Sequence, residues 1–402
     1  DHGSRWIELS GGVPTISFRD IKLQRRENDV VGATIGRGFY VLDDYSPLRE
    51  IRQGALEQPA SLFPVRDAWW YVPLAPGQAE GSPSLGSTEF VAPNPPFGAL
   101  ITYFLQEAPK TAKGLRRDQE KELTELGDSV PFPGWEALRA ESLEQEPRVL
   151  ITISDTSGQA VRRIEGPAES GIHRVNWDLR WPAPNPIELE AAGFRPPWAS
   201  DPQGPLATPG RYRAELALIT ANGVQVLGVP QEFEVRELPT SIWPTPDHAQ
   251  VAEFHRQTGE LLRQAMGAGR QLAQAEERLP YLRQALLATP QAPTTLFAKL
   301  DQLETDLSAV RLQLRGDPIL SRFEEPSVPS ILGRAWRVAG GAWSTRQAPT
   351  LTQQRSLEVA QNEFSAVKGE LARLLGETLP GLEAELDAAG APWTPGRELP
   401  PE

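Results

Sequence analysis

The stretch RENDVVGATIGRGFYVLDDYSPLRE, residues 26–50, decides how the first part of this chain folds. Its three glycines, Gly32, Gly36 and Gly38, follow the spacing G-x-x-x-G-x-G, and two adjacent aspartates come soon after them. Glycines at short intervals can form a phosphate-binding loop, and two carboxylates can form a catalytic acid pair. The third alternative is that both features belong to the turns of a β-sheet.

The glycines do not have the sequence context of a phosphate-binding loop. A P-loop has the pattern G-x-x-x-x-G-K-[S/T], but Gly36 is followed by Arg37 and no Lys-Ser or Lys-Thr pair comes next. A dinucleotide-binding loop leads from a strand into a helix, whereas Gly38 is followed by FYVLDD, which has the composition of a strand. We therefore predict that Gly36, Arg37 and Gly38 form a turn between two strands and bind no nucleotide.

Asp43 and Asp44 are poorly placed for paired-carboxylate catalysis. Adjacent residues on a strand point to opposite faces of the sheet. The two carboxylates of a glycosidase site, in contrast, converge on one bond from ~5 to ~9 Å apart. Aspartate is common in turns, where its side chain bonds the local backbone. We predict that both residues end a strand and cap the turn that follows.

Short strands surround these turns throughout residues 1–43. The pattern predicts four strands, at 6–9, 18–23, 29–34 and 38–42. Four strands in about forty residues correspond to one β-propeller blade, which cannot bury its faces alone. We predict that residues 1–47 form the last blade of a propeller whose other blades lie upstream. The chain begins at Asp1 without an initiator methionine, and we expect a fragment or a processed product.

Residues 48–97 are rich in proline and in aromatic side chains. They include Trp69, Trp70 and the run APNPPFG at 92–98. Free linkers are poor in aromatic residues. We therefore expect an extended connector that packs along its neighbours.

Between residues 98 and 240 the sequence predicts an antiparallel β-sandwich of the immunoglobulin or fibronectin type III kind. Strand patterns occur at 98–105, 148–155, 159–166, 173–179, 211–220 and 229–238. Turn sequences such as Ala221-Asn-Gly223 separate them. Two insertions interrupt the domain, a Pro-rich one at 182–209 and a charged, partly helical one at 106–147. The charged insertion is either a solvated helix or a cap over a neighbouring domain.

From residue 245 to 390 the hydrophobic period becomes helical, and three heptad-like stripes predict an antiparallel bundle of three long helices. The stripes comprise Val251, Phe254, Thr258, Leu261, Ala265, Ala268, Leu272, Ala275, Leu279, Leu282 and Leu286; Leu296, Leu300, Leu303, Leu307, Val310 and Leu314; and Ala360, Phe364, Val367, Leu371 and Leu374. Residues 331–338 predict a short helix, Pro280 is expected to kink the first long one, and 391–402 form a tail. The predicted fold class is multidomain, all-β followed by all-α.

The composition excludes several classes of function. The chain of 402 residues has a net charge of −13, which disfavours nucleic acid as a partner, and it lacks the ~18 consecutive apolar residues of a membrane span. Cysteine is absent, which excludes disulfides and thiolate chemistry. The four histidines, His2, His173, His248 and His255, lack the i, i+4 spacing of a helical metal site. G-x-S-x-G is absent as well, and we predict no catalytic residue, no cofactor and no metal.

The stretch HRVNWDLRWP, residues 173–182, combines aromatic, acidic and basic side chains of the kind that bind sugars. On a strand, however, alternation places Val175, Trp177 and Leu179 on one face, which favours a core position for them. Core packing is therefore the main interpretation. The alternative is contact with carbohydrate or a partner, for which the candidates are Trp69, Trp70, Trp177 and Trp181.

Several motifs together resemble a known family. DHGSRWIEL resembles the back half of an Asp-box, S-x-D-x-G-x-x-W, with Asp1, Gly3 and Trp6 in the matching positions. The opening stretch resembles the last blade of bacterial sortilin-type, vacuolar-sorting-receptor-like propellers, except that Ile35 stands where the family commonly has His. Four further stretches resemble the remainder of that architecture: FVAPNPPFGALITYFLQEAP, GIHRVNWDLRWP, GPLATPGRYRAELAL and RGDPIL. The resemblance covers essentially the whole chain.

The resemblance implies an exported protein, periplasmic or extracellular, of a group often labelled glycosyl hydrolases by analogy with neuraminidase-repeat propellers. Asp-boxes in that group are structural turns, and its catalytic carboxylates would lie in blades that this chain lacks. A non-catalytic scaffold or binding region, with upstream blades as its partners, is therefore expected. Two alternatives remain open: an accessory, carbohydrate-contacting region of a glycoside hydrolase, and a protein-docking module that uses the helical bundle.

Overall fold

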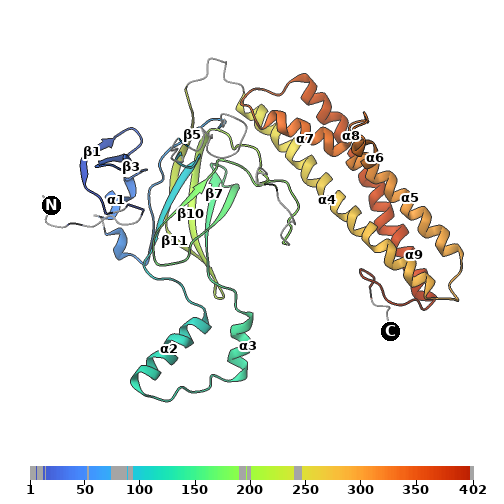
Figure 1. The fold of residues 1–402 in the computed structure, drawn as a ribbon, viewed down its shortest axis with the longest axis horizontal. Coiled ribbons are helices and arrows are strands. Elements are labelled where there is room, and N and C mark those ends of the chain that lie inside the picture. Colours follow the sequence, from blue (N-terminus) through green and yellow to red (C-terminus); the bar gives the residue numbers. More distant parts are fainter. Residues whose placement is uncertain are drawn as a thin grey trace. The chain divides into compact units, whose positions relative to one another are not determined.

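The computed structural model describes residues 15–51, 54–73, 94–189, 201–239 and 247–398, together with the single residues 6, 12, 13, 88 and 196. Strands dominate the first part of the described chain and helices the last part (Figure 1). Contacts divide the chain into two units. The first comprises residues 1–73, 84–179 and 209–239, and the second 74–83, 180–208 and 240–402.

The opening stretch forms most of a three-stranded antiparallel sheet. Its strands are β1 (Phe18–Gln24), β2 (Asp29–Thr34) and β3 (Phe39–Leu42), in that order across the sheet. They match the strands predicted at 18–23, 29–34 and 38–42, whereas the one predicted at 6–9 lies outside the described residues except for Trp6. The short helix α1 (Ser46–Glu50) and a 3-10 turn at Ala55–Glu57 follow.

Two further sheets make up the rest of the first unit. The larger has the order β5-β11-β10-β7-β8 and the smaller the order β4-β6-β9. Their strands are β4 (Ala60–Leu62), β5 (Ala68–Trp70), β6 (Ala99–Leu105), β7 (Arg148–Asp155), β8 (Ala160–Gly166), β9 (Gly171–Trp177), β10 (Gly210–Thr220) and β11 (Gly223–Glu237). Neighbouring strands are antiparallel, except that β5 and β11 are parallel.

The six strands predicted between residues 98 and 240 are all present, and β11 begins at Gly223 rather than at residue 229. The strands β4 and β5 lie in the segment 48–97, which the sequence indicates only as an extended connector. Each has three residues, too few to show an alternating pattern. Their pairing with β6 and β11 therefore depends on residues far away in the sequence.

The five-stranded sheet and the β4-β6-β9 sheet enclose a common core. Trp177 on β9 lies edge-to-face against Tyr212 on β10 and Phe233 on β11, with ring centroids 5.1 and 6.1 Å apart. Because β9 belongs to the smaller sheet and its two partners to the larger one, these rings join the sheets. Gly98 precedes β6 with φ +122°, and a Cβ there would lie 1.9 Å from the Trp177 carbonyl oxygen. Only glycine fits this position.

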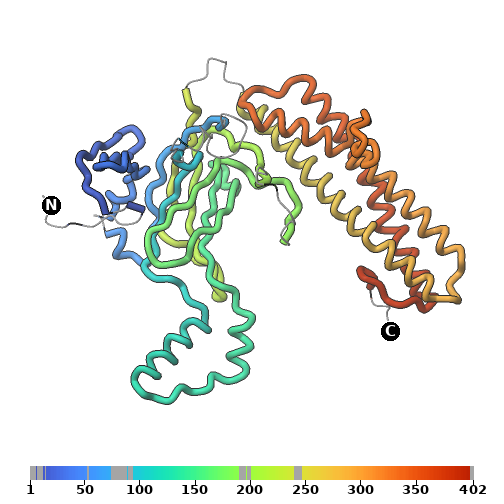
Figure 2. The backbone as a smooth tube through the Cα atoms, in the orientation of Figure 1, coloured from blue at the N-terminus to red at the C-terminus, as the bar shows by residue number. Residues whose placement is uncertain are grey.

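The insertion at 106–147 forms a helical hairpin of α2 (Ala112–Leu126) and α3 (Trp135–Leu143), which is clear in the backbone tube (Figure 2). Neither helix contains a buried residue. Arg116 joins the two helices through Glu141 at 2.6 Å. The predicted helix is therefore present, and its charged side chains lie in solvent except for those around the Arg116–Glu141 contact.

The second unit contains the predicted helical bundle. Its helices are α4 (His248–Leu287), α5 (Thr295–Arg315), α6 (Pro318–Arg322), α7 (Ile331–Ala342), α8 (Leu351–Arg373) and α9 (Leu379–Ala388), with a π-helical turn at Leu374–Thr378. Every residue of the three predicted stripes is buried. Pro280 lies inside α4, which continues as one helix through this residue, and the kink expected there stays a prediction.

Side-chain pairs between the helices define their directions. The pairs are Arg283–Asp301 at 2.8 Å and Arg311–Glu276 at 3.5 Å between α4 and α5, and Gln264–Lys368 at 3.3 Å and Arg278–Glu383 between α4 and α8–α9. As residue numbers rise along α4, those of the partners fall along α5 and rise along α8–α9. The long helices thus alternate in direction, as the predicted antiparallel bundle requires. α5 runs opposite to α4, and α8–α9 runs opposite to α5 and so parallel to α4. Trp343, at the end of α7, lies beside Gly259, so α7 covers the first half of α4.

Candidate functional site

The opening stretch is joined to the sheets that follow it through backbone carbonyls. Arg174 on β9 donates hydrogen bonds to the carbonyl oxygens of Asp43 and Asp44, at 2.6 and 2.7 Å. Asp44 is buried and has φ +45°. Its N–H donates to Asp29 Oδ1 at 3.0 Å, and its carboxylate accepts from the Ser46 N–H at 3.1 Å. Both aspartates therefore lie just after β3 and fix the turn into α1.

A second arginine joins the β1–β2 turn to the same region. Arg66 donates to the carbonyl oxygen of Glu27, and its guanidinium lies 3.4 Å from the Glu27 carboxylate and 3.8 Å from Asp29. The indole Nε1 of Trp69 donates to Glu27 Oε1 at 3.3 Å. Trp69, one of the candidate contact residues, therefore helps to hold the β1–β2 turn in place.

The surroundings of the Asp43 carboxyl group indicate a structural rather than a catalytic role. Burial raises the pKa of its carboxyl group, the Asp29 carboxylate adds to the rise, and Arg174 and Arg66 oppose it. A perturbed carboxylate is a candidate catalyst where it lines a cleft beside a second reactive group. Here both arginines bind the main chain of the turns instead, so the arrangement positions the sheet.

The glycine cluster forms the turn between β2 and β3. Gly36 and Gly38 have φ of +81° and +68°, in the left-handed region that favours glycine. The Thr34 N–H donates to the Gly38 carbonyl oxygen at 3.0 Å and closes the turn, while Arg37 is exposed. A strand follows, so the turn lacks the helix N-terminus on which nucleotide-binding loops hold phosphate.

The candidate tryptophans have different environments. Trp177 is 0% exposed and Trp70 is also buried, so neither ring has a face on which a sugar could stack. The contact role considered for these two residues is therefore wrong, because they belong to the core. Trp69 and Trp181 are only half-buried.

The Asp-box positions are described only in part. Asp1 and Gly3 lie outside the described residues. Trp6 is 88% exposed. The structural role that the resemblance implies for these three residues stays a prediction.

Histidine forms no metal site in the described part of the chain, where no group of three or more His, Asp or Glu side chains is placed to hold a metal ion. His255 is buried near the Ala342 carbonyl group, and burial lowers the pKa of its imidazole to about 4. His173 lies on β9, with its Nε2 atom 2.7 Å from the Glu169 carbonyl oxygen. The geometry of both histidines is that of packing residues.

The N-terminal sheet exposes apolar side chains on both of its faces, a feature that the sequence analysis did not identify. Cross-strand neighbours share a face. The register pairs Ile21 with Gly32 and Gly32 with Tyr40, whereas Val31 pairs with Val41 on the opposite face. The most exposed apolar residues of the three strands are Ile21 and Leu23 on one face and Phe39 and Val41 on the other. A sheet at a protein surface usually has one apolar and one polar face, so this pattern is typical of a sheet packed between two others.

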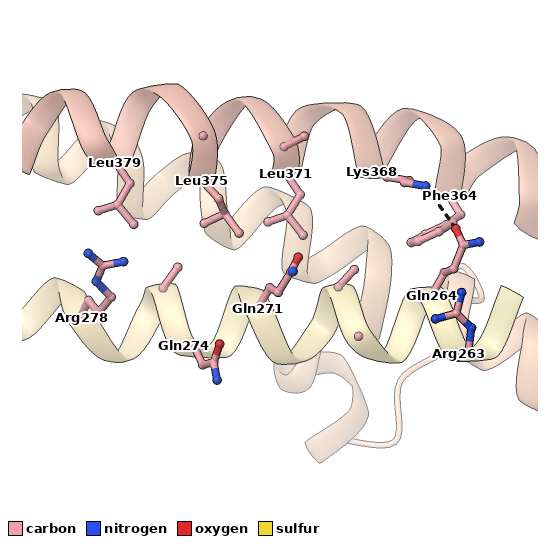
Figure 3. A pocket seen from close by; sticks show the side chains of 15 residues that line it. Arg263, Gln264, Gln271, Gln274, Arg278, Phe364, Lys368, Leu371, Leu375 and Leu379 are labelled. Atoms are coloured by element: carbon pink, nitrogen blue, oxygen red, sulfur yellow. Dashed lines mark hydrogen bonds between the residues drawn. The ribbon is translucent and has the colours of Figure 1, made fainter. Parts of the chain in front are cut away.

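A groove runs between α4 and α8 in the helical bundle (Figure 3). It has a volume of 730 Å³, and the walls include Gln264 and Gln271 from α4 and Lys368 from α8. Lys368 Nζ donates to Gln264 Oε1 at 3.3 Å across it. The π-helical turn at Leu374–Thr378 borders the groove and precedes Pro380, which lacks the N–H that an α-helix would use there. The sequence signal for this groove is a seven-residue spacing of glutamines, which the analysis of apolar stripes missed.

No protein-family model, curated protein or solved structure matches this chain. Its function is therefore inferred from its own residues and their geometry. Within the part of the chain that the structure describes, no helix combines the length and apolar composition needed to cross a lipid bilayer.

Proposed function

We propose that this chain is a non-catalytic scaffold and binding region. Its N-terminal sheet is the last blade of a β-propeller and stacks against further blades of the same protein. The observation that carries the proposal is the exposure of apolar side chains on both faces of the β1–β3 sheet. Blades inside a propeller are covered on both sides, so such a sheet is apolar on both sides.

The joint between this sheet and its neighbours supports a positioning role. Arg174 and Arg66 donate to the carbonyl oxygens of Asp43, Asp44 and Glu27. Contacts to the main chain fix the position of the sheet and leave both of its faces open. This is the arrangement that a blade at the end of a stack requires.

In the same proposal, the five-stranded sheet and the β4-β6-β9 sheet form a sandwich of the immunoglobulin or fibronectin type III kind. The ring cluster around Trp177 and the mainly antiparallel pairing support this assignment. The relationship to sortilin-type propellers and the export of the protein belong to the proposal as well. Both rest on the motif resemblance alone.

Contact with carbohydrate is the second candidate function. It is favoured by the partial exposure of Trp69 and Trp181, since exposed indole faces stack on sugar rings. Trp181 is the better candidate, because the indole N–H of Trp69 is already bonded to Glu27. A glycan array probed with the intact chain and with Trp181→Ala tests this. The intact chain should bind a glycan that the variant binds less well, and a failure of the intact chain to bind any glycan argues against the role.

The blade proposal predicts how a polar substitution on an exposed face behaves. Phe39→Ser should reduce the binding of an apolar fluorescent dye and leave the thermal unfolding midpoint of the chain unchanged, because the ring is 74% exposed. Phe63→Ser is the matched control: this ring is 1% exposed, and its loss should cost about 3–5 kcal/mol. An equal loss of stability in both variants would mean that Phe39 is packed within this chain and would contradict the proposal.

A further inference from the structure

Glutamine recurs every seven residues along the facing edges of α4 and α8. The row on α4 is Gln250, Gln257, Gln264 and Gln271, and the row on α8 is Gln354 and Gln361, continued by Lys368 and Leu375. In parallel neighbouring helices, heptad positions of this kind flank the buried seam and face one another. The hydrogen bond between Lys368 and Gln264 fixes this register.

Three hollows along these rows merge into one groove, which we call the α4–α8 groove. Their volumes are 730, 310 and 310 Å³. The first two share Gln264, Phe364 and Lys368. The last two share Gln257 and Gln361. The groove therefore follows α8 along nearly its whole length.

The other seams of the bundle are bridged by ion pairs. Arg283 contacts Asp301 at 2.8 Å between α4 and α5, and Lys299 contacts Glu385 at 2.5 Å between α5 and α9. Across the α4–α8 groove Lys368 instead meets the side-chain amide of Gln264, and the Arg278–Glu383 ion pair lies only at the α9 end. Covering charged pairs costs more desolvation free energy than covering amides that can bond one another. The α4–α8 groove is therefore the face of the bundle best suited to docking.

Side chains of opposite charge line the two ends of the groove. Glu253 and Glu358 line one end, and Glu253 is paired with Arg256. Arg263, Arg278 and Lys368 line the other end, and the two arginines are paired with Glu260 and Glu383. Within the described residues, neither Glu358 nor Lys368 has an ion-pair partner, so both are available for a charge from outside the chain. The groove is complementary to a copy of itself turned end to end.

We propose that the α4–α8 groove is an interface with a second copy of this chain. A two-fold axis that crosses α8 between Gln361 and Ser365 sets the two α8 helices antiparallel. It brings Glu358 of one copy to Lys368 of the other, and the symmetry repeats this contact. The same surface serves both copies, as a two-fold contact requires.

The α8 wall and the size of the groove fit this interface. The side chains of Ser365, Gly369 and Ala372 are small, so the two α8 helices can approach closely. The 23 residues of α8 span about 34 Å, and two helices are about 20 Å wide. The resulting area of about 700 Å² per copy is close to the ~800 Å² per partner of a standard interface.

Sedimentation equilibrium of the full chain tests the proposal. The unmodified chain should sediment as a dimer with twice its mass of 44.2 kDa. Glu358→Lys and Lys368→Glu should each raise the dissociation constant of the dimer about tenfold or more, because each brings like charges together. The double variant restores opposite charges in both contacts and should recover the dissociation constant of the unmodified chain.

A steric pair of variants provides a second readout. Ala372→Trp, on the groove wall, should prevent dimerisation, whereas Ala309→Trp, at an exposed site on α5, should not. Circular dichroism checks that both variants keep their helices. A chain that stays monomeric at every concentration overturns the proposal. So does a dimer that is insensitive to the charge and steric variants of the groove, or a double charge variant that dimerises no better than the single ones.

Discussion

His255 lies buried beside the end of α7, and burial holds the pKa of its imidazole at about 4. In an unfolded chain the pKa of histidine is near 6.5. The unfolded state therefore binds the additional proton between these two pH values, and folding stability falls as the pH drops from about 6.5 to about 4. A difference of about 2.5 pKa units corresponds to a loss of about 3 kcal/mol.

Replacing this imidazole should remove the dependence on pH. We expect His255→Gln to flatten the unfolding free energy between pH ~6.5 and ~4, as measured by urea denaturation at several pH values. His248→Gln, at the start of α4, is the matched control and should keep the slope of the unmodified chain. If the unfolding free energy of His255→Gln fell with pH as steeply as that of the unmodified chain, groups other than His255 would cause the acid sensitivity.

The roles of single residues were predictable where neighbours in the sequence determine them. A strand after Gly38 excludes a phosphate loop, and alternation along β9 places Trp177 in the core. The contacts of Arg174 were not predictable, because it bonds the Asp43 carbonyl oxygen across 131 residues of sequence. Exposure on two faces of one sheet likewise depends on strand register, which local sequence does not determine.

At the scale of elements, the long helices were predictable because each apolar stripe repeats over many turns. The strands β4 and β5 were not, since three residues carry no period. Pro280 removes one backbone hydrogen bond from α4, yet the helix continues through it. Leu279 and Leu282 on either side are buried in the bundle core, and this packing accounts for the continuity of α4.

The segment after α9, predicted as a tail, is tied to the bundle over residues 391–398. The buried Arg397 side chain pairs with Asp387 and donates to the Pro392 carbonyl oxygen at 2.7 Å. Arg278 on α4 donates to the Gly396 carbonyl oxygen at 2.8 Å. These contacts connect the last described residues to both α9 and α4.

Removing the buried arginine should release this segment. Arg397→Ala should lower the free energy of unfolding by about 2 kcal/mol, because it leaves Asp387 without its partner and exposes carbonyl groups. Arg355→Ala, at an exposed site on α8, should stay within about 0.5 kcal/mol of the unmodified chain. Urea denaturation compares the two. Equal effects would show that Arg397 contributes no more than a surface arginine.

At the scale of the whole molecule, the N-terminal sheet differs from the rest of the first unit. The five-stranded sheet and the β4-β6-β9 sheet share a core that contains Trp177, whereas the β1–β3 sheet exposes apolar side chains on each face. A three-stranded sheet needs a covered apolar face for independent stability. In this chain, therefore, the sheet should open more readily than the sheets beside it.

Hydrogen exchange of the intact chain tests this central claim most directly. Backbone amides of β1, β2 and β3 should exchange about 100-fold faster or more than the paired amides of β7 and β10, a difference of about 3 kcal/mol in opening free energy. That result supports a blade that awaits its neighbours. Protection of β1–β3 equal to that of β7 and β10 would contradict the account, because it would mean that the sheet is already fully packed within this chain.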